Sequence, residues 1–278
     1  MAEDRVDRSD LAEHEQSAQI PRLSLSKGRG RSENLVAARL WQTDPTACCS
    51  IPRDTSGKAC AARRRRSEAK ALSLPATTTL FVDVGGVLLT DGWGRGSRSL
   101  AAQEFELDLL ELDDRHSQAM GTYEMGRLNL AEYLDRVVFH VPRSFSREAF
   151  WNFMCEQSKP FPEMIDLIGR LKAEFALKIV VVSNEARELN AYRVERFGLG
   201  AFVDCFVSSC FVHIRKPDVD IFRLALDVSQ ATADQVIYIE NTSMFVQIAD
   251  GIGIPSILHT DYPTTRAALE RFGFRAEP

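Results

Sequence analysis

Thr79-Leu80-Phe81-Val82-Asp83-Val84-Gly85-Gly86-Val87-Leu88 is the stretch that decides the fold of this 278-residue chain. An apolar strand that stops at an acid and is followed by a flexible turn places that acid at the end of the strand. In open α/β folds the carboxyl ends of the strands form the rim of the sheet that carries the chemistry. Asp83 is therefore the candidate nucleophile.

Two later β-branched runs end in the same way. The run at 178–182 is followed by Ser183-Asn184, and the run at 236–239 is followed by Glu240-Asn241. Runs that are apolar on both faces suit buried parallel strands. A parallel sheet would bring the polar residues after each run to the rim that carries Asp83.

Between these runs, Lys216 stands before Pro217 and ahead of a helical pattern at 221–228, which places Lys216 in a loop stiffened by the proline. A carboxylate, a hydroxyl with an amide, a lysine and an acidic pair at one rim indicate a site for an anionic substrate with a divalent cation. Each feature alone has a structural explanation. Ser183 suits a helix N-cap, Lys216 a solvated loop, and Glu240 the start of a helix.

The four segments, in this order, resemble the haloacid dehalogenase superfamily of hydrolases. Beside the first motif, the chain carries "VVSNE", "RKPDxxIF" and "FVxIAxGxGI" in sequence, and the resemblance covers about residues 77–273. It is closest to members whose first motif reads D-x-G-G/N-V and that carry a small helical cap. The resemblance implies an α/β fold, a doubly wound Rossmann-like parallel sheet with an inserted small α-helical cap. It does not specify a substrate.

The resemblance also implies a two-step displacement. Asp83 would attack phosphorus to give an aspartyl-phosphate that water then cleaves. Ser183 and the backbone of Asn184 would bind phosphate oxygens, and Lys216 would screen those oxygens from Asp83.

Mg²⁺ is the implied cofactor. Asp83, the carbonyl of Gly85, and Glu240 or Asn241 would hold it and neutralise charge on the transferring group. The acidic pair reads Glu-Asn where the family usually has Asp-Asp, which removes one negative charge. We therefore expect weaker metal binding than at an Asp-Asp site, but not its loss.

A second departure concerns proton transfer. In phosphatases of this family the residue two after the nucleophile is usually another Asp, which protonates the leaving oxygen and then activates water. Here it is Gly85, which cannot move a proton, and positioned acid–base catalysis contributes about 10²- to 10⁴-fold. Asp91, in the Gly-rich stretch 90–96, and His213, three residues before Lys216, are the candidate substitutes.

Three classes of function remain open. The leading class is a Mg²⁺-dependent phosphatase acting on a small phosphorylated metabolite. A metal-free 2-haloacid dehalogenase uses the same Asp on carbon and tolerates Gly85, but gains nothing from Glu240 and usually carries a cap or flap arginine for the halide. A catalytically degenerate domain that serves as a binding or regulatory module is motivated by Gly85 and Asn241.

We expect three parts in the chain. Residues 1–75 read as a disordered tail with 14 basic and 10 acidic residues, residues 76–96 and 161–278 as the α/β core, and residues 97–160 as the helical cap. Core strands are expected near 78–84, 177–182, 203–208, 235–240 and 254–258, and core helices near 162–174, 185–197, 219–228, 243–250 and 262–272. Cap helices are expected at 99–112, 130–139 and 147–155, and polar cap groups that a substrate could contact are Tyr123, Glu124, Arg127, Arg136 and His140.

Composition disfavours other classes of partner. The arginine run at 63–66 has no interleaved aromatic residues, so a nucleic-acid partner is not favoured. No apolar run reaches membrane-spanning length, and the start shows no signal-peptide core. The six cysteines lack metal-ligand spacing, so we expect a reduced, cytoplasmic protein without structural zinc. The sequence does not specify an oligomeric state.

Overall fold

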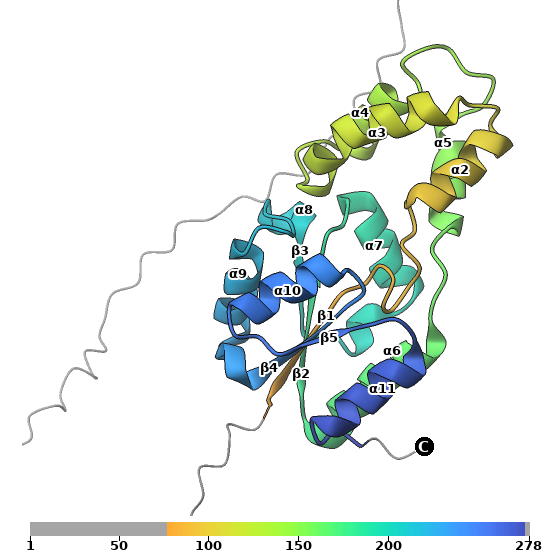
Figure 1. Cartoon of the computed structure of the whole chain (residues 1–278). Helices are drawn as coiled ribbons and strands as arrows, with labels where there is room; N and C mark the ends of the chain where they lie inside the picture. Colours follow the sequence, from red (N-terminus) through yellow and green to blue (C-terminus); the bar gives the residue numbers. More distant parts are fainter. Residues whose placement is uncertain (1–76, 276–278) are drawn as a thin grey trace, which may run out of the picture. The chain divides into compact units, whose positions relative to one another are not determined.

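A parallel sheet with helices on both faces forms the centre of the structure, a computed structural model that describes residues 77–275 (Figure 1). Within these residues the sheet contains β1 (Thr79–Val82), β2 (Lys178–Ser183), β3 (Cys205–Ser208), β4 (Val236–Glu240) and β5 (Ser256–Leu258). The strand order is β3-β2-β1-β4-β5, and all four neighbouring pairs are parallel. The doubly wound α/β fold predicted from the sequence is confirmed. The predicted tail at 1–75 lies outside the described residues.

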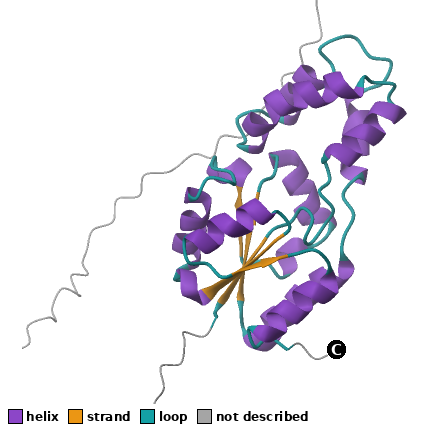
Figure 2. Cartoon of the chain, in the orientation of Figure 1, coloured by secondary structure: helices purple, strands orange, loops and turns teal. Residues whose placement is uncertain are grey.

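The core helices follow the strands closely. They are α6 (Pro162–Phe175), α7 (Arg187–Arg196), α8 (Ser209–Val212), α9 (Asp220–Ser229), α10 (Ser243–Gly251) and α11 (Tyr262–Arg271), with 3₁₀ turns η1 (Leu199–Ala201) and η2 (Ala233–Gln235). Figure 2 shows the strands enclosed between helical layers. Each expected core strand and helix is present, with its ends shifted by at most two residues.

Alternate residues of β1 pack against different layers, as the pleat of a strand requires. Leu80 belongs to the cluster that contains Leu171 of α6 and Leu269 of α11. Phe81 belongs to the cluster on the opposite face, with Phe222 of α9. Because both faces of β1 are buried, its continuous apolar sequence suits the central position in a parallel sheet.

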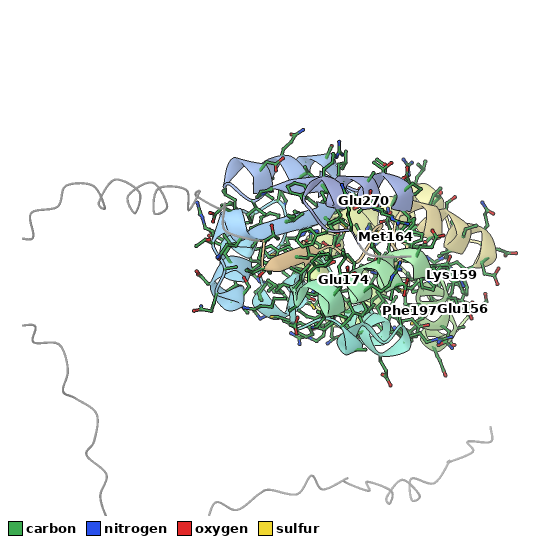
Figure 3. All side chains as sticks on the ribbon, turned by 90° about the horizontal axis from the view of Figure 1, so that it is seen from below. Glu156, Lys159, Met164, Glu174, Phe197 and Glu270 are labelled. Atoms are coloured by element: carbon green, nitrogen blue, oxygen red, sulfur yellow. The ribbon has the colours of Figure 1, made fainter. Side chains whose placement is uncertain are left out.

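The helix α6 shows how an outer layer is built. Met164 is 1% exposed and packs in the core, whereas Glu174 on the same helix is exposed to solvent. Both side chains are labelled in Figure 3, where the helix is seen from below the sheet. The helix begins with Pro162 at its first turn, where the missing N–H of proline costs no hydrogen bond.

A separate group of helices is inserted between β1 and α6. It comprises α2 (Arg95–Glu104), α3 (Leu109–Glu124), α4 (Leu130–Val137) and α5 (Arg147–Glu156). These helices have their own hydrophobic core, in which Tyr133, Phe150 and Met154 are fully buried. They lie on the side of the core that carries the strand ends of the rim (Figure 1).

The single helix predicted at 99–112 is wrong. The chain forms two helices there, because Glu106 takes a left-handed conformation (φ 51°) and Asp108 then caps α3 by accepting a hydrogen bond from the Glu111 N–H. Glycine and asparagine are the residues usually found in the left-handed region, so a glutamate gives no sequence signal for this break. In the part of the chain that the structure describes, no helix combines the length and apolar character needed to cross a membrane.

Candidate active site

A cavity of about 380 Å³ opens where the strand ends of the sheet meet the inserted helices. Most residues singled out from the sequence line it, namely Asp83, Gly85, Asp91, Ser183, Asn184, Lys216 and Asn241. Parallel strands bring their carboxyl ends to one edge, and this is how segments far apart in the sequence reach one cavity. Glu240 and His213 do not line the cavity.

Lys216 joins the two carboxylates of the rim. Its Nζ lies 3.1 Å from Asp83 Oδ2 and 2.6 Å from Glu240 Oε2, and it donates to the Tyr238 hydroxyl at 3.1 Å. The side chain is 1% exposed, so its aliphatic part is buried while the ammonium remains fully paired. Asp83 keeps its Oδ1 oriented by accepting the Val84 N–H at 2.8 Å. Asp83 lines the cavity, and its two carboxylate oxygens are held by Lys216 and by the Val84 N–H.

Glu240 lies behind Lys216 and is 0% exposed. Its Oε1 accepts the Thr242 N–H at 2.8 Å, and its Oε2 accepts from Lys216 and from the Tyr238 hydroxyl. Burial, together with the charge of Asp83, raises the pKa of Glu240, and Lys216 opposes that rise. Both oxygens of Glu240 thus already accept protein hydrogen bonds, whereas the neighbouring Asn241 lines the cavity.

Ser183 and Asn184 have different surroundings. Ser183 is the last residue of β2 and lines the cavity, while the N-cap of the following helix is Ala186, so Ser183 is not a helix cap. The Asn184 side chain accepts the Lys216 N–H at 2.8 Å and donates to the Lys216 carbonyl at 2.9 Å. The amide of Asn184 therefore fixes the backbone of Lys216.

Three glycines lie next to Asp91, and two of them, Gly86 and Gly94, make room for its side chain. A Cβ on Gly85 would lie 3.7 Å from Asp91 Oδ1, a Cβ on Gly94 3.2 Å from Asp91 Cβ, and a Cβ on Gly86 3.0 Å from Asp91 Oδ1. The same Gly86 Cβ would lie 1.9 Å from Asn241 Nδ2, and Gly86 has a φ of +74°. Gly86 of the first motif thus allows Asp91 and Asn241 to approach the backbone beside Asp83.

His213 lies outside the cavity. It is exposed and its Nδ1 donates to the Met125 carbonyl at 2.6 Å, which ties a core loop to the end of α3. The structure does not bring this candidate substitute acid to the cavity, although it lies only three residues before Lys216 in the sequence. Asp91 is the candidate that the structure brings to the cavity.

Sequence reasoning missed most of the residues that form the rest of the cavity wall. Trp93, Arg98, His116, Met120, Met154, Glu185, Leu189 and Arg193 all line the cavity. Of the polar groups expected on the inserted helices, Tyr123 and Glu124 line it, whereas Arg127, Arg136 and His140 do not. Cavity-lining residues of a helix cannot be told from other half-buried positions by periodicity alone.

Glu185 and Arg193 form a buried ion pair in this wall. Arg193 Nη1 lies 2.5 Å from Glu185 Oε1, and the side chains are 2% and 3% exposed. Arg193 also donates to Ser158 Oγ at 3.0 Å and to the Thr90 carbonyl at 3.1 Å. The guanidinium thereby connects α7 to both chain segments that lead into and out of the inserted helices.

The oxygen donors at the rim fit a magnesium ion that keeps several non-protein ligands. Asp83 offers a carboxylate, Gly85 a backbone carbonyl and Asn241 an amide, all on the cavity. Within residues 77–275 no group of three or more His, Cys, Asp or Glu forms a cage for a metal. Mg²⁺ commonly binds through one or two carboxylates, with waters and substrate phosphate oxygens completing its shell.

Comparisons with known proteins show to which family the chain belongs. Residues 77–243 match the family model of the haloacid dehalogenase-like hydrolases. A stretch of 80 residues is 35% identical to the pyrimidine 5'-nucleotidase YjjG of Escherichia coli (strain K12), which is 29% of this chain and about a third (35%) of that relative's length.

Solved structures share the fold. A predicted HAD-like family hydrolase from Porphyromonas gingivalis superposes with a TM-score of 0.58 at 18% identity, covering 72% of this chain and 100% of that one. A HAD family enzyme of Bacteroides thetaiotaomicron, in complex with magnesium and inorganic phosphate, gives a TM-score of 0.56 at 16% identity, with 66% and 93% covered.

Proposed function

Because the chain belongs to the haloacid dehalogenase-like hydrolase family, we propose that it is a Mg²⁺-dependent phosphatase that hydrolyses a small phosphate ester through an aspartyl-phosphate on Asp83. The observation that carries this proposal is the pairing of Asp83 with the buried Lys216 at the end of the cavity. A fixed cation beside the nucleophile would offset the repulsion between a carboxylate and an approaching phosphate.

In the first step an oxygen of Asp83 attacks phosphorus in line, forming the O–P bond while the bond to the leaving oxygen breaks. The leaving oxygen takes a proton from Asp91. In the second step water attacks the phosphorus of the aspartyl-phosphate, gives its proton back to Asp91, and releases Asp83 and inorganic phosphate. Asp91 would thus carry out the proton transfers, because Gly85 has no side chain that can donate or accept a proton.

Phosphate oxygens would be held by groups on two segments of the chain. The Ser183 hydroxyl and the Asn184 N–H come from the end of β2, and the Lys216 ammonium comes from the loop before α9. The Asn184 side chain would act by holding Lys216 in place, since both of its polar atoms bond to the Lys216 backbone. Such a preorganised set of donors needs little rearrangement during the reaction.

For the metal we propose Asp83, the Gly85 carbonyl and Asn241 as ligands, with Glu240 holding Lys216 instead. When bound there, Mg²⁺ would neutralise negative charge on the transferring phosphoryl group. This assignment narrows the sequence-based expectation, in which Glu240 and Asn241 were alternatives. The basis is that Asn241 lines the cavity and Glu240 is enclosed.

The dehalogenase alternative is less well supported by the cavity. Arg98 and Arg193, which line it, are paired with Asp113 at 2.7 Å and with Glu185 at 2.5 Å. A guanidinium already neutralised by a carboxylate is a poor receptor for a departing halide. The proposal therefore keeps the phosphatase as the leading function.

We further propose that residues 97–160 act as a cap that restricts the site to small molecules and limits entry of water. We also propose that the protein is located in the reducing cytoplasm. The described cysteines, Cys155, Cys205 and Cys210, are free thiols, which is the usual state in that compartment.

The test is hydrolysis by the full chain with and without Mg²⁺, using 4-nitrophenyl phosphate and a panel of phosphate esters that includes nucleoside monophosphates. We expect phosphate release that needs Mg²⁺ and is lost in Asp83→Asn. A 2-chloropropionate control measures halide release. Halide release without phosphate release would replace this function with that of a dehalogenase. The absence of both products would favour the binding module.

A further inference from the structure

The cavity wall made by Trp93, the inserted helices and α7 carries no uncompensated charge among the described residues. Arg98 is paired with Asp113 and also donates to the Trp93 carbonyl at 3.0 Å. Arg193 is paired with Glu185, as described above. A third pair joins Glu124 to Arg215, with Oε2 and Nη2 2.8 Å apart.

The remaining side chains of this wall are aromatic or apolar. They are Trp93, Met120, Tyr123, Met154 and Leu189. Aromatic faces and methionine thioethers favour contact with a flat or apolar ring. A charged leaving group would have to be buried here without a counter-ion, which is costly.

One polar group of this wall is set by a chain of buried hydrogen bonds. Trp93 Nε1 donates to the Tyr133 hydroxyl at 2.7 Å, and that hydroxyl lies 2.7 Å from Nδ1 of His116. An indole N–H can only donate, so the Tyr133 oxygen accepts from Trp93 and its own hydrogen needs an acceptor. Tyr133 is 0% exposed, and His116 Nδ1 is the acceptor within reach.

This chain fixes the tautomer of His116. If Nδ1 accepts the Tyr133 hydrogen, a neutral imidazole carries its own hydrogen on Nε2. Burial, together with the positive charge of Arg98, lowers the pKa of His116 to about 4, against the raising effect of Asp113. The ring is therefore neutral at pH 7, with Nε2–H as a donor.

His116 is one of the residues that line the cavity, and it is 6% exposed. Among the described residues, Nε2 of His116 has no hydrogen-bond partner. Nε2 is also not fully enclosed by protein atoms, so a ligand can reach it. A ligand that occupies the cavity is thus the natural acceptor for this N–H.

We propose that His116 is a specificity-determining residue, whose Nε2–H donates a hydrogen bond to an acceptor oxygen or nitrogen on an uncharged, ring-containing leaving group. The inference rests on the proposed function for the phosphate end of the substrate and adds the class of leaving group. It follows that substrates with a carbonyl or ring-nitrogen acceptor are preferred over equally sized apolar ones, and over ones with a carboxylate.

The first test needs no substrate. ¹⁵N NMR of the full chain with labelled histidine reports the tautomer, and His116→Gln assigns its signals among the five histidines. A neutral ring with hydrogen on Nε2 at pH 7 is expected. Hydrogen on Nδ1, or a charged imidazolium at pH 7, would overturn the proposal.

The second test uses 4-acetylphenyl phosphate and 4-isopropylphenyl phosphate, which have similar shapes but differ in the carbonyl acceptor. The ratio of their kcat/KM values is expected to fall roughly 2- to 12-fold in His116→Phe, the fold-change that corresponds to one hydrogen bond. Differences in intrinsic reactivity cancel when wild type and variant are compared. His140→Phe, outside this cavity, is the matched control and should keep the wild-type ratio.

Binding by Asp83→Asn separates this inference from the proposed function. If wild type hydrolyses neither ester, calorimetry on Asp83→Asn still measures whether the acetyl ester binds more tightly than the isopropyl ester. A preference that disappears in the Asp83→Asn, His116→Phe double variant supports the role of His116 even where phosphatase activity is absent. Equal ratios in wild type and His116→Phe, by turnover or by binding, would reject it.

Discussion

The carboxylate of Asp91 lies beside Gly85, with Oδ1 3.7 Å from the position that a Cβ on Gly85 would occupy. Gly85 stands where a second acid is usual in related phosphatases, so the chain lacks that acid two residues after the nucleophile but regains a carboxylate from the following loop. The close approach depends on Gly86 and Gly94, where a Cβ would lie 3.0 Å from Asp91 Oδ1 and 3.2 Å from Asp91 Cβ. Asp91 thereby becomes the natural proton donor and acceptor in the proposed mechanism.

Replacement of Asp91 is expected to slow the reaction strongly. Asp91→Asn should reduce kcat by about 10²- to 10⁴-fold, the usual contribution of a positioned acid–base group. The melting temperature of the protein should change little, because Asp91 is exposed. Asp114→Asn, an exposed carboxylate on α3 outside the cavity, is the control. A kcat within three-fold of wild type would remove Asp91 from the mechanism.

A second substitution, at Gly85, tests the role of Asp91 independently. A Cβ on Gly85 would meet its nearest neighbours at 3.6 and 3.7 Å, which is ordinary van der Waals contact. Gly85→Asp should therefore be accommodated, and it should recover part of the activity lost in Asp91→Asn. Steady-state kcat of the double variant against Asp91→Asn alone is the measurement. No recovery in a folded double variant would mean that the two positions do not serve the same role.

Metal affinity should respond differently to the two residues of the acidic pair. Asn241→Asp adds a carboxylate on the cavity and should tighten Mg²⁺ binding on the order of ten-fold. Glu240→Gln should change the Mg²⁺ affinity less but destabilise the fold by about 3 kcal/mol, because Lys216 would lose its nearest buried counter-charge. Titration calorimetry with Mg²⁺ and urea unfolding separate the two effects. A larger loss of Mg²⁺ affinity in Glu240→Gln than in any Asn241 variant would return Glu240 to the metal.

Sequence reasoning predicted the fold correctly, and placed Asp83 at the rim of the sheet, because both depend on local patterns. The β-branched runs specify buried parallel strands, and the topology of a parallel sheet brings Asp83, Ser183 and Asn241 to one edge. The order of the four motifs then identified the superfamily, which the family match over 77–243 confirms.

The different surroundings of Glu240, which is enclosed, and Asn241, which lines the cavity, could not be predicted in this way. Adjacent residues after a strand point to different sides, and which of them faces the cavity depends on where Lys216 and Tyr238 lie in three dimensions. For the same reason the sequence could not show that His213 lies outside the cavity, since a short distance in sequence from Lys216 says nothing about direction.

Gly86 should be intolerant of any side chain. Gly86→Ala forces a Cβ to within 1.9 Å of Asn241 Nδ2 and a positive φ on alanine, so we expect a loss of stability of about 1 to 3 kcal/mol and weaker Mg²⁺ binding. The control is Gly96→Ala, since Gly96 lies in α2, where a Cβ would meet nothing within 4 Å. That change should be neutral or stabilise by up to about 1 kcal/mol. Equal urea midpoints for the two variants would contradict the steric role of Gly86.

The buried histidine should make stability depend on pH. The pKa of His116 is lowered from 6.5 to about 4 by burial and by Arg98, so the unfolded chain binds a proton at a pH where the folded chain does not. The stabilising contribution of the neutral ring is therefore present above about pH 6.5 and is lost as the pH falls towards 4. The full difference amounts to about 3 kcal/mol.

This dependence is measured by urea unfolding of wild type and His116→Gln between pH 7 and pH 4. The pH-dependent part of the free-energy difference between them should shrink across that window. A difference that stays constant with pH would show that His116 has an ordinary pKa in the folded protein.

The inserted helices were recognised from the sequence, but the chemistry of their cavity wall was not. Trp93, Tyr133 and His116 come from a loop and two helices, and their hydrogen-bond chain exists only once those elements pack. Periodicity marks such residues as buried, and the partner of each polar atom is set by tertiary contacts.

The most direct test of the central claim is the melting temperature of the full chain with Mg²⁺ plus beryllium fluoride, a phosphoryl mimic, in wild type and in Asp83→Asn. At about 100 times the dissociation constant, bound ligand should add about 2.7 kcal/mol, or roughly 5 to 10 °C. The proposed mechanism predicts a rise in wild type that requires both Mg²⁺ and Asp83. No rise in wild type, or an equal rise in Asp83→Asn, would contradict a phosphoryl-transfer site built on Asp83.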